Sequence, residues 1–276
     1  MIEVCRKPAS ICKVIPDLER LTTPADVARF AESEKNAIEQ RISTRGLDLR
    51  LARRSDIQAI QDFQAQRFAK GTLLEDGYVL YRIVRFGCAV IVENADGQIV
   101  GCNLCQSFDD PDRTLWGVRN SADPSVSGAN LAAELASYTS FIGMLRGSRF
   151  RRGFFAPTNF GSAANSLNHV GFIAEALDFD VPGHQGPRFV VAMPLTPAGM
   201  RNNRIDVEKV LSFMDTHRAG DDYRTVASSD TQGLADMYAN SPFRVVAFLK
   251  AGQRVTENSF FALPEKVLNL RKPQPW

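Results

Sequence analysis

The sequence predicts an α/β fold in which a mixed central sheet is flanked by helices. Three short strand patterns follow one another between residues 88 and 118, with turn residues between them, as in an antiparallel meander. A strand and two helical patterns precede the meander, and a helix, a strand, a short helix and two more strands follow it. This order differs from the regular strand–helix alternation of doubly wound parallel folds.

Composition excludes several classes of protein. The 276 residues carry 33 basic and 31 acidic side chains, without the clustered basic face that nucleic-acid binding requires. No apolar run reaches the roughly 18 residues of a membrane span. The charged N-terminus does not resemble a secretory signal, so the five cysteines are expected to be reduced thiols in a cytoplasmic protein. Cys102 and Cys105 have CxxC spacing, but their strand directs them to opposite faces, which disfavours a metal site.

Residues 1–46 predict a helical N-terminal extension, in which Thr23 caps a helix with Pro24 at its first position and Gly46 follows the end. Ser55 is predicted to cap a second helix, and a further helix is predicted over residues 73–86. Beyond a central domain of residues 47–196, residues 197–276 predict an α/β extension. Its expected elements are helices around residues 207–214 and 234–238 and a strand at 244–249.

The long helix after the meander has the clearest periodicity. Apolar residues spaced by four and three are Leu131, Leu135, Tyr138, Ile142 and Leu145. The segment before it contains Pro124, Ser127 and Gly128. It is read either as an ordinary helix start or as a loop whose backbone amides hold a phosphate. The nearby basic run, Arg146 to Arg152, is either a solvated loop or a phosphate contact.

Three motifs stand in this order: TLWGVRNSADPSVSGANLAAEL, FFAPTNFGSAANSL and HVGF. Together with the element order they resemble the GNAT fold of the N-acetyltransferase superfamily. The resemblance spans about residues 47–195 and is best over 114–172. It implies an acyl-CoA-dependent N-acyltransferase, with acetyl-CoA or another acyl-CoA as co-substrate and a small-molecule amine as acceptor.

The pyrophosphate loop of this family reads Arg or Gln, two residues, Gly, one residue, then Gly or Ala. Ser127 takes the first position, Asn130 the first Gly position and Ala132 the last, so two of the three positions depart. Small residues and free N–H groups at a helix start still suit an anion. The residues that the resemblance assigns to the pyrophosphate are Ser127, Gly128, Ala129, Asn130, Leu131 and Ala132.

The resemblance also implies that Trp116 and Val118, on a strand that bends from its neighbour, pair with the pantetheine arm of the cofactor. Asn159 and Ser162 would hold the same arm. The other interpretation of Asn159 is a helix or turn cap.

Many members of the family use a Tyr as the acid in the short helix, and residues 161–169 contain none. Ser166 lies nearest that position and can donate to a thiolate, and His169 can act through its imidazole. Asp109 is the candidate base, although its Asp-rich neighbourhood also suits a plain turn. Arg119 could meet an acidic acceptor or a phosphate, and Glu134 is expected on a solvated helix face.

The missing Tyr leaves three alternatives open. The enzyme works by positioning alone, or it takes its acyl chain from an acyl carrier protein to make N-acyl amino acids or acyl-homoserine lactones, or it binds a ligand without turnover. The two extensions would suit a larger pocket or a homodimer interface. The 18 phenylalanines fit either an acyl tunnel or an ordinary core.

Overall fold

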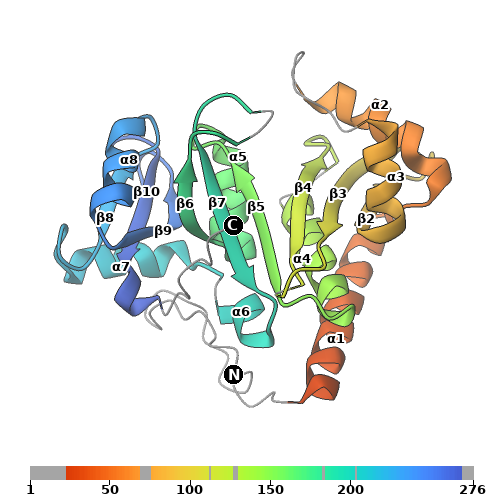
Figure 1. Cartoon of the computed structure of the whole chain (residues 1–276), viewed down its shortest axis with the longest axis horizontal. Helices are drawn as coiled ribbons and strands as arrows, with labels where there is room; N and C mark the ends of the chain where they lie inside the picture. The colour runs from red at the N-terminus through yellow and green to blue at the C-terminus, as the bar shows by residue number, and fades with distance from the viewer. Residues whose placement is uncertain are drawn as a thin grey trace. The chain divides into compact units, whose positions relative to one another are not determined.

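The computed structural model describes residues 23–68, 76–111, 113–126, 130–181, 184–202 and 204–268 (Figure 1). The chain divides into two compact units at Arg152 and Gly153. The domain boundaries predicted after residues 46 and 196 stay a prediction.

The elements of the first unit are α1 (Pro24–Ser43), β1 (Asp48–Leu51), η2 (Arg54–Asp56), α2 (Ile57–Arg67), α3 (Gly77–Phe86), β2 (Cys88–Glu93), β3 (Ile99–Ser107), β4 (Leu115–Ala122), α4 (Leu131–Leu145) and the start of β5 (Phe150–Phe155). The second unit holds the rest of β5 and then α5 (Phe160–Ala163), the π-helix η3 (Ala164–Val170), β6 (Ile173–Asp178), β7 (Arg188–Pro194), α6 (Pro197–Asn202), α7 (Val207–Thr216), β8 (Arg224–Ala227), α8 (Thr231–Asn240), β9 (Phe243–Leu249), β10 (Ser259–Pro264) and η4 (Glu265–Val267).

The predicted mixed sheet is confirmed. Seven strands are hydrogen-bonded in the order β1-β2-β3-β4-β5-β7-β6. The pairs β1–β2, β2–β3, β3–β4 and β6–β7 are antiparallel, whereas β4 and β5 are parallel. Strand, two helices, meander, helix, strand, helix and two strands therefore follow one another as the sequence predicts.

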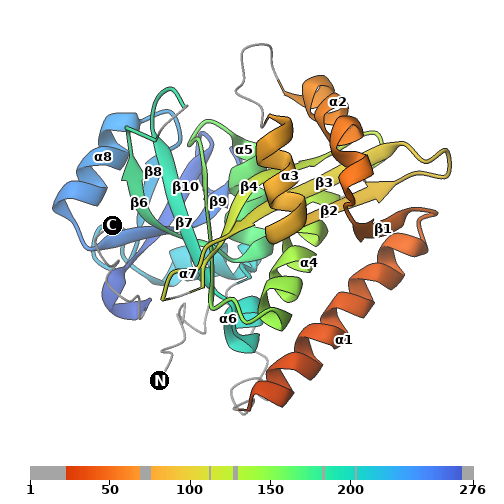
Figure 2. The ribbon, with the colours of Figure 1, turned by 45° about the vertical axis from the view of Figure 1, so that its right-hand side comes forward.

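Helices cover both faces of the sheet in the first unit (Figure 2). On one face, α2 and α3 pack on β2 and β3 through a buried core that includes Ile60, Leu80, Ile91 and Leu104. On the other face, α4 packs on β3, where the side chain of Leu135 approaches Gly101. Because successive strand residues alternate between faces, this two-sided cover explains why most residues of β2 and β3 are buried.

The N-terminal helix begins and ends as predicted. The hydroxyl of Thr23 accepts a hydrogen bond from the N–H of Asp26 at 3.2 Å, Pro24 is the first helical residue, and Gly46 follows the end with a φ of +72°. Its apolar side packs on α4, with the rings of Phe30 and Phe141 5.8 Å apart. The α4 helix is therefore buried on its outer side as well as on its sheet side.

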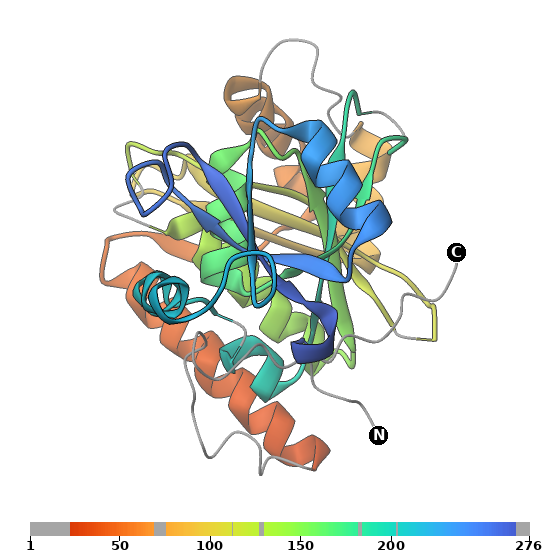
Figure 3. The same ribbon diagram turned by 90° about the vertical axis from the view of Figure 1, so that its left-hand side faces the viewer.

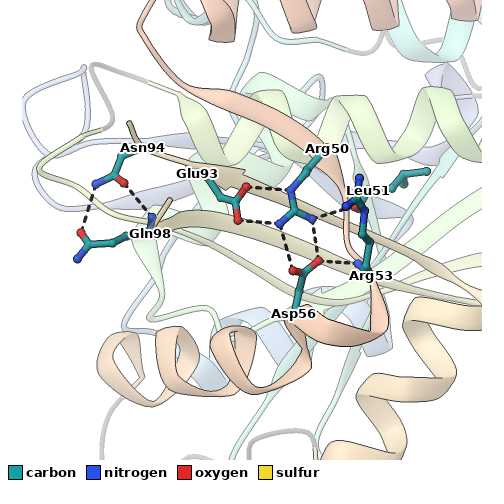
Figure 4. Close-up of polar contacts among 7 residues, drawn as sticks. All are labelled: Arg50, Leu51, Arg53, Asp56, Glu93, Asn94 and Gln98. Atoms are coloured by element: carbon teal, nitrogen blue, oxygen red, sulfur yellow. Dashed lines mark hydrogen bonds and ion pairs between the residues drawn. The ribbon is translucent and has the colours of Figure 1, made fainter. Parts of the chain in front are cut away.

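The start of the second helix differs from the prediction. Ser55 does not cap it, because residues 54–56 form the short η2 turn and α2 begins at Ile57. The carboxylate of Asp56 instead accepts the N–H of Arg53 at 2.6 Å and two hydrogen bonds from Arg50, which also binds Glu93 at 2.7 Å (Figure 4). The hydrogen bonds from Arg50 lower the pKa of Asp56 below its usual range. The next helix, α3, begins at Gly77 with Asp76 as its cap, and the residues predicted before it, 73–75, lie outside the described residues.

The C-terminal extension contains more β-structure than its sequence predicts. Besides the predicted strand β9, the short strands β8 and β10 complete a three-stranded antiparallel sheet in the order β8-β10-β9. Figure 3 views the second unit from the side of these elements, which are drawn in blue. Because β8 has only four residues and β10 is an apolar run of six, neither shows the alternation that marks a half-buried strand.

Two polar side chains form hydrogen bonds between the C-terminal extension and two elements that precede it in the same unit, β6 and the π-helix. The hydroxyl of Tyr238 donates to the carbonyl of Ala174 in β6 at 2.9 Å and accepts from the N–H of Val245 in β9 at 3.3 Å. The amide of Asn168, in the π-helix, donates to the carbonyl of Phe248 at 2.8 Å and accepts from its N–H at 2.9 Å. The extension is thus bonded to the segment that carries the predicted catalytic residues.

We predict that Asn168→Asp lowers the free energy of unfolding at neutral pH by about 2 kcal/mol or more, because one hydrogen bond becomes a repulsive contact between a buried carboxylate and the carbonyl of Phe248. Burial raises the pKa of such a carboxyl, so the folded state binds more protons than the unfolded state. The loss of stability therefore shrinks as the pH falls towards 4.

Urea unfolding at pH 7 and pH 4 measures both effects. Asn165→Asp, on the same π-helix but half-buried, is the matched control and should change stability little. Equal losses in the two variants would contradict the role of Asn168.

Candidate functional site

The predicted bend of the strand that contains Trp116 is confirmed. The β3–β4 register shifts between the pairs Leu104–Arg119 and Cys105–Gly117, so Val118 is an extra residue in a β-bulge. On the other side of β4, the parallel ladder with β5 pairs Leu115 with Arg151 and Trp116 with Arg152, and within the described residues it extends no further. The backbone of β4 beyond Trp116 therefore has N–H and C=O groups that neither ladder uses in the regular way.

The start of α4 lies in the same unit as this bulge. Asn130 precedes the helix with a φ of +90° and a ψ of +16°, in the left-handed region. Glycine adopts that region freely, and asparagine tolerates it better than most other residues. Asn130 therefore satisfies the backbone requirement of the position at which the resembled loop has Gly, although its side chain differs. The preceding Ser127, Gly128 and Ala129 lie outside the described residues.

The first turn of α4 offers donors to an anion. The first intrahelical bond runs from the N–H of Glu134 to the carbonyl of Asn130 at 2.9 Å, so the N–H groups of residues 131–133 precede the helical ladder. Within the described residues, the side chain of Asn130 makes no capping hydrogen bond to them. Amides in this position, together with the helix dipole, favour a negatively charged group.

The bulge and the helix start are held together by Asn120. This β4 residue lies two positions beyond Val118, and its side-chain amide donates to the carbonyl of Ala132 at 2.9 Å. The side-chain oxygen of Asn120 is buried and has no hydrogen-bond partner in the described part of the chain. Asn120 was not among the residues singled out from the sequence, because an Asn in a strand carries no periodic signal that distinguishes it.

The predicted residues of the second unit lie on one helical segment. Asn159 caps α5, since its side-chain oxygen accepts the N–H of Ser162 at 3.1 Å, which confirms the cap interpretation. The predicted short helix continues as a π-helix up to Gly171, and this wider turn contains Ser166 and His169. Ser166 is half-buried and His169 is exposed. The contact of Asn159 and Ser162 with a cofactor, and the catalytic roles of Ser166 and His169, stay predictions.

Asp109 belongs to the first unit, whereas Ser166 and His169 belong to the second. Asp109 is exposed and lies next to a turn that Asp110 stabilises by accepting a hydrogen bond from the N–H of Thr114 at 2.7 Å. The turn interpretation is therefore correct for Asp110, Asp112 lies outside the described residues, and the role of Asp109 as a base stays a prediction.

Two other polar residues have structural partners that the sequence did not predict. The carboxylate of Glu134 is not only solvated, because it forms ion pairs with Arg41 of α1 and with Arg45, two residues beyond the end of that helix. The guanidinium of Arg119 lies 5.3 Å from the ring centre of Phe68 at the end of α2. Glu134 thus links α1 to α4, and its position in an ion-pair cluster does not favour a role as a base.

The basic run after α4 includes arginines whose guanidinium groups bind other parts of the protein. It is therefore neither wholly a solvated loop nor wholly a phosphate contact. Arg151 is 3% exposed, and its guanidinium donates to Thr139 at 2.8 Å, Ser140 at 2.6 Å and Asn103 at 3.1 Å. Arg146 donates to the carbonyl of Gly87 at 2.5 Å. The spacing of the run gave no sign of this, because a buried arginine is recognised only by the oxygen atoms that surround it.

Gln64 is a further residue that the sequence did not single out. It lies on the buried side of α2, one turn after Ile60 and one turn before Phe68, and is fully buried. Among the residues that the structure describes, neither the side-chain nitrogen nor the side-chain oxygen of Gln64 has a hydrogen-bond partner. A buried amide without partners costs stability and calls for an explanation, such as a water or a ligand group.

The two cysteines with CxxC spacing point to opposite faces, as predicted. The sulfur of Cys102 lies 3.4 Å from the Ser121 hydroxyl, whereas that of Cys105 lies 3.1 Å from Asn103 on the α4 side. Burial raises the pKa of the Cys105 thiol. In the described part of the chain, no group of three or more His, Cys, Asp or Glu could hold a metal ion, and no helix is long and apolar enough to cross a bilayer.

No family model matches the chain, and no curated protein matches it. Solved structures do. The NatC complex bound to Gag peptide and CoA has a chain that is 13% identical, with a TM-score of 0.48 over 54% of this chain and 99% of that one. A GNAT-family acetyltransferase from Listeria monocytogenes is 15% identical, with a TM-score of 0.41 over 54% and 94%. The spermidine/spermine N-acetyltransferase SpeG from Vibrio cholerae is 14% identical, with a TM-score of 0.44 over 54% and 94%.

We predict that the left-handed backbone conformation at Asn130 limits which amino acids can replace it without loss of stability. Asn130→Gly should leave the free energy of unfolding within about 1 kcal/mol of the parent, because glycine adopts a positive φ readily. Asn130→Val should lower it by about 1–2 kcal/mol, because a β-branched side chain clashes in the left-handed region. Urea denaturation measures both, and a Val variant as stable as the Gly variant would show that the left-handed conformation is not required.

We predict that Gln64→Met raises the free energy of unfolding by about 1–3 kcal/mol, because an apolar side chain of similar length removes two unpartnered polar atoms from the core. Thermal and urea unfolding measure the change. Gln66→Met, at an exposed position of the same helix, is the matched control and should have little effect. A loss of stability in Gln64→Met would mean that the amide has a bound partner, such as a water, in the folded protein.

Proposed function

We propose that this chain is an acyl-CoA-dependent N-acyltransferase that moves an acyl group, with acetyl as the leading candidate, to the amine of a small molecule. One observation carries the proposal. The β-bulge at Val118 and the start of α4, where the side chain of Asn130 makes no capping hydrogen bond to the described residues, lie in one compact unit and are joined by the hydrogen bond from Asn120 to Ala132. A bent strand followed by an anion-accepting helix start is what the resemblance to N-acetyltransferases requires.

The donor set fits the parts of an acyl-CoA. The pantetheine arm contains amides, which need backbone N–H and C=O partners of the kind that β4 offers beyond Trp116, at the Val118 bulge. The pyrophosphate is an anion, which the N–H groups of Leu131 and Ala132 favour. Asn130 supplies the left-handed turn that lets the chain enter the helix.

The reaction that we assign is aminolysis of a thioester. A neutral amine attacks the acyl carbonyl, and the nitrogen of the tetrahedral intermediate loses a proton to a base. The C–S bond then breaks, so that a C–N bond replaces it and the sulfur leaves as thiolate or, once protonated, as thiol. The side chain of Asp109 is the proposed acceptor of the ammonium proton. The hydroxyl of Ser166 is the proposed donor to the departing sulfur, with His169 as the other candidate. Because a thiolate is a tolerable leaving group, positioning is expected to supply much of the rate.

We predict that isothermal titration detects binding of acetyl-CoA and that Asn130→Asp weakens it about tenfold or more, because a carboxylate then stands beside the pyrophosphate. Asp tolerates the left-handed conformation, so this variant should keep its fold. Asn130→Gly is the matched control and should retain the parent affinity. Titration with free CoA and a longer acyl-CoA shows how much the acyl chain contributes.

Turnover is tested separately with a thiol-reactive dye and a panel of amines. Thiol release that depends on both acyl-CoA and an amine supports the proposal. Binding of acyl-CoA without thiol release would favour a protein that binds the ligand only. No binding of any of the three CoA compounds would overturn the acyl-CoA assignment.

A further inference from the structure

The outward face of α3 exposes large aromatic side chains, which contact with water alone does not explain. Tyr78 and Phe86 are 68% and 65% exposed, the highest fractions among the large apolar side chains of the described residues. They are eight residues apart, and Arg82 lies midway between them, one helical turn from each. The buried Leu80 and Ile83 occupy the opposite side of the helix. We call Tyr78, Arg82 and Phe86 the α3 stripe.

Further positive charge flanks the α3 stripe. Arg85 lies on the same exposed side, with its guanidinium 5.5 Å from the ring centre of Phe86. Arg54, from η2, lies 5.5 Å from the ring centre of Tyr81. Within the described residues, none of Arg54, Arg82 and Arg85 forms a salt bridge, although such pairs occur elsewhere in the chain. The helix itself contains no acidic residue.

We propose that the α3 stripe is a docking surface for an acidic helix of another protein. Exposed Tyr, Phe and Arg are the residue types that concentrate binding energy in protein interfaces, whereas Lys is depleted there. Three arginines that have no carboxylate partner among the described residues favour an acidic ligand, and the two exposed aromatic rings favour apolar contacts on either side of them. The partner is a helix in which an apolar residue, an acidic residue and an apolar residue succeed one another at four-residue spacing.

The surroundings favour a local acidic motif over an extended polyanion or a lipid surface. The neighbouring helix α2 exposes Gln58 and Asp62, which bond to each other at 3.0 Å, so the positive surface does not extend across it. The α3 helix has ten residues and is about 15 Å long. Nucleic acid and anionic membranes draw on many cations spread over a wider face, whereas a single partner helix needs only this width.

The test uses the full chain and a fluorescein-labelled helical peptide, rich in Ala and Gln, with Leu, Glu and Leu at four-residue spacing and a second Glu beside the first. A matched peptide carries Lys at both Glu positions. Fluorescence anisotropy should show binding of the Glu peptide at least about tenfold tighter than of the Lys peptide. Arg82→Glu should reverse the preference, because the charge at the centre of the stripe is inverted.

Matched variants separate the α3 stripe from the rest of the surface. Phe86→Ser should weaken binding of the Glu peptide, whereas Phe108→Ser, at another exposed phenylalanine, should not. Arg149→Glu, at an exposed arginine outside the stripe, should leave the preference unchanged. Acetyl-CoA binding should be the same in Arg82→Glu and the parent chain, which shows that the variant is folded.

Equal binding of the two peptides, or an equal effect of Arg149→Glu and Arg82→Glu, would overturn the proposal. So would binding of a 20-nucleotide single-stranded DNA, or of vesicles with 30% phosphatidylserine, that exceeds Glu-peptide binding and is lost in Arg82→Glu. Those outcomes would assign the face to a nucleic acid or to a membrane.

Discussion

The buried guanidinium of Arg151 is the interaction on which the geometry of the first unit depends. It extends from the first residues of β5 and donates to Ala136, Thr139 and Ser140 of α4 and to Asn103 of β3. A buried charge costs less when hydrogen bonds compensate it, and the acceptors of Nη1 and Nη2 come from both α4 and β3, so the positions of helix and strand are fixed together. Apolar contact alone would let α4 slide along the sheet, because the hydrophobic effect is not directional.

This network bears on the site because β4 lies between β3 and β5. Arg151 pairs with Leu115 at the point where the parallel ladder runs, and the bulge at Val118 follows three residues later along β4. Asn120 then bonds the first turn of α4 to the same strand. The strand that carries the bulge and the start of α4 are thus joined by the hydrogen bond from Asn120 to Ala132. Fixed dipoles favour electrostatic recognition because they need little reorganisation when a ligand binds.

The second unit shows the same use of buried amides and hydroxyls. The side-chain amide of Asn168 forms hydrogen bonds with both the N–H and the C=O of Phe248 in β9. The hydroxyl of Tyr238 forms hydrogen bonds with both β6 and β9. The aromatic rings of Phe189, Phe248 and Phe260 form a buried cluster there, which places these phenylalanines in the core. The C-terminal extension is thus part of the framework around the π-helix, which gives it a structural reason to accompany the sheet.

Local patterns in the sequence are sufficient to predict the order of the elements and several of their ends. Periodicity located α4, and Thr23, Pro24 and Gly46 marked the limits of α1, because caps and turns act over a few neighbouring residues. The resemblance carried by residues 114–172 pointed to the β4 bend and to the α4 start, and both are present.

The other features of the site and the core depend on tertiary contacts. It showed that Asn130 adopts the glycine-like conformation, that Glu134 pairs with α1, and that Arg151, Asn168 and Gln64 are buried. These properties depend on partners that are distant in the sequence, and a polar side chain shows no pattern by which its burial could be foreseen. The short strands β8 and β10 were missed for the same reason, since the sheet pairing that stabilises them is non-local.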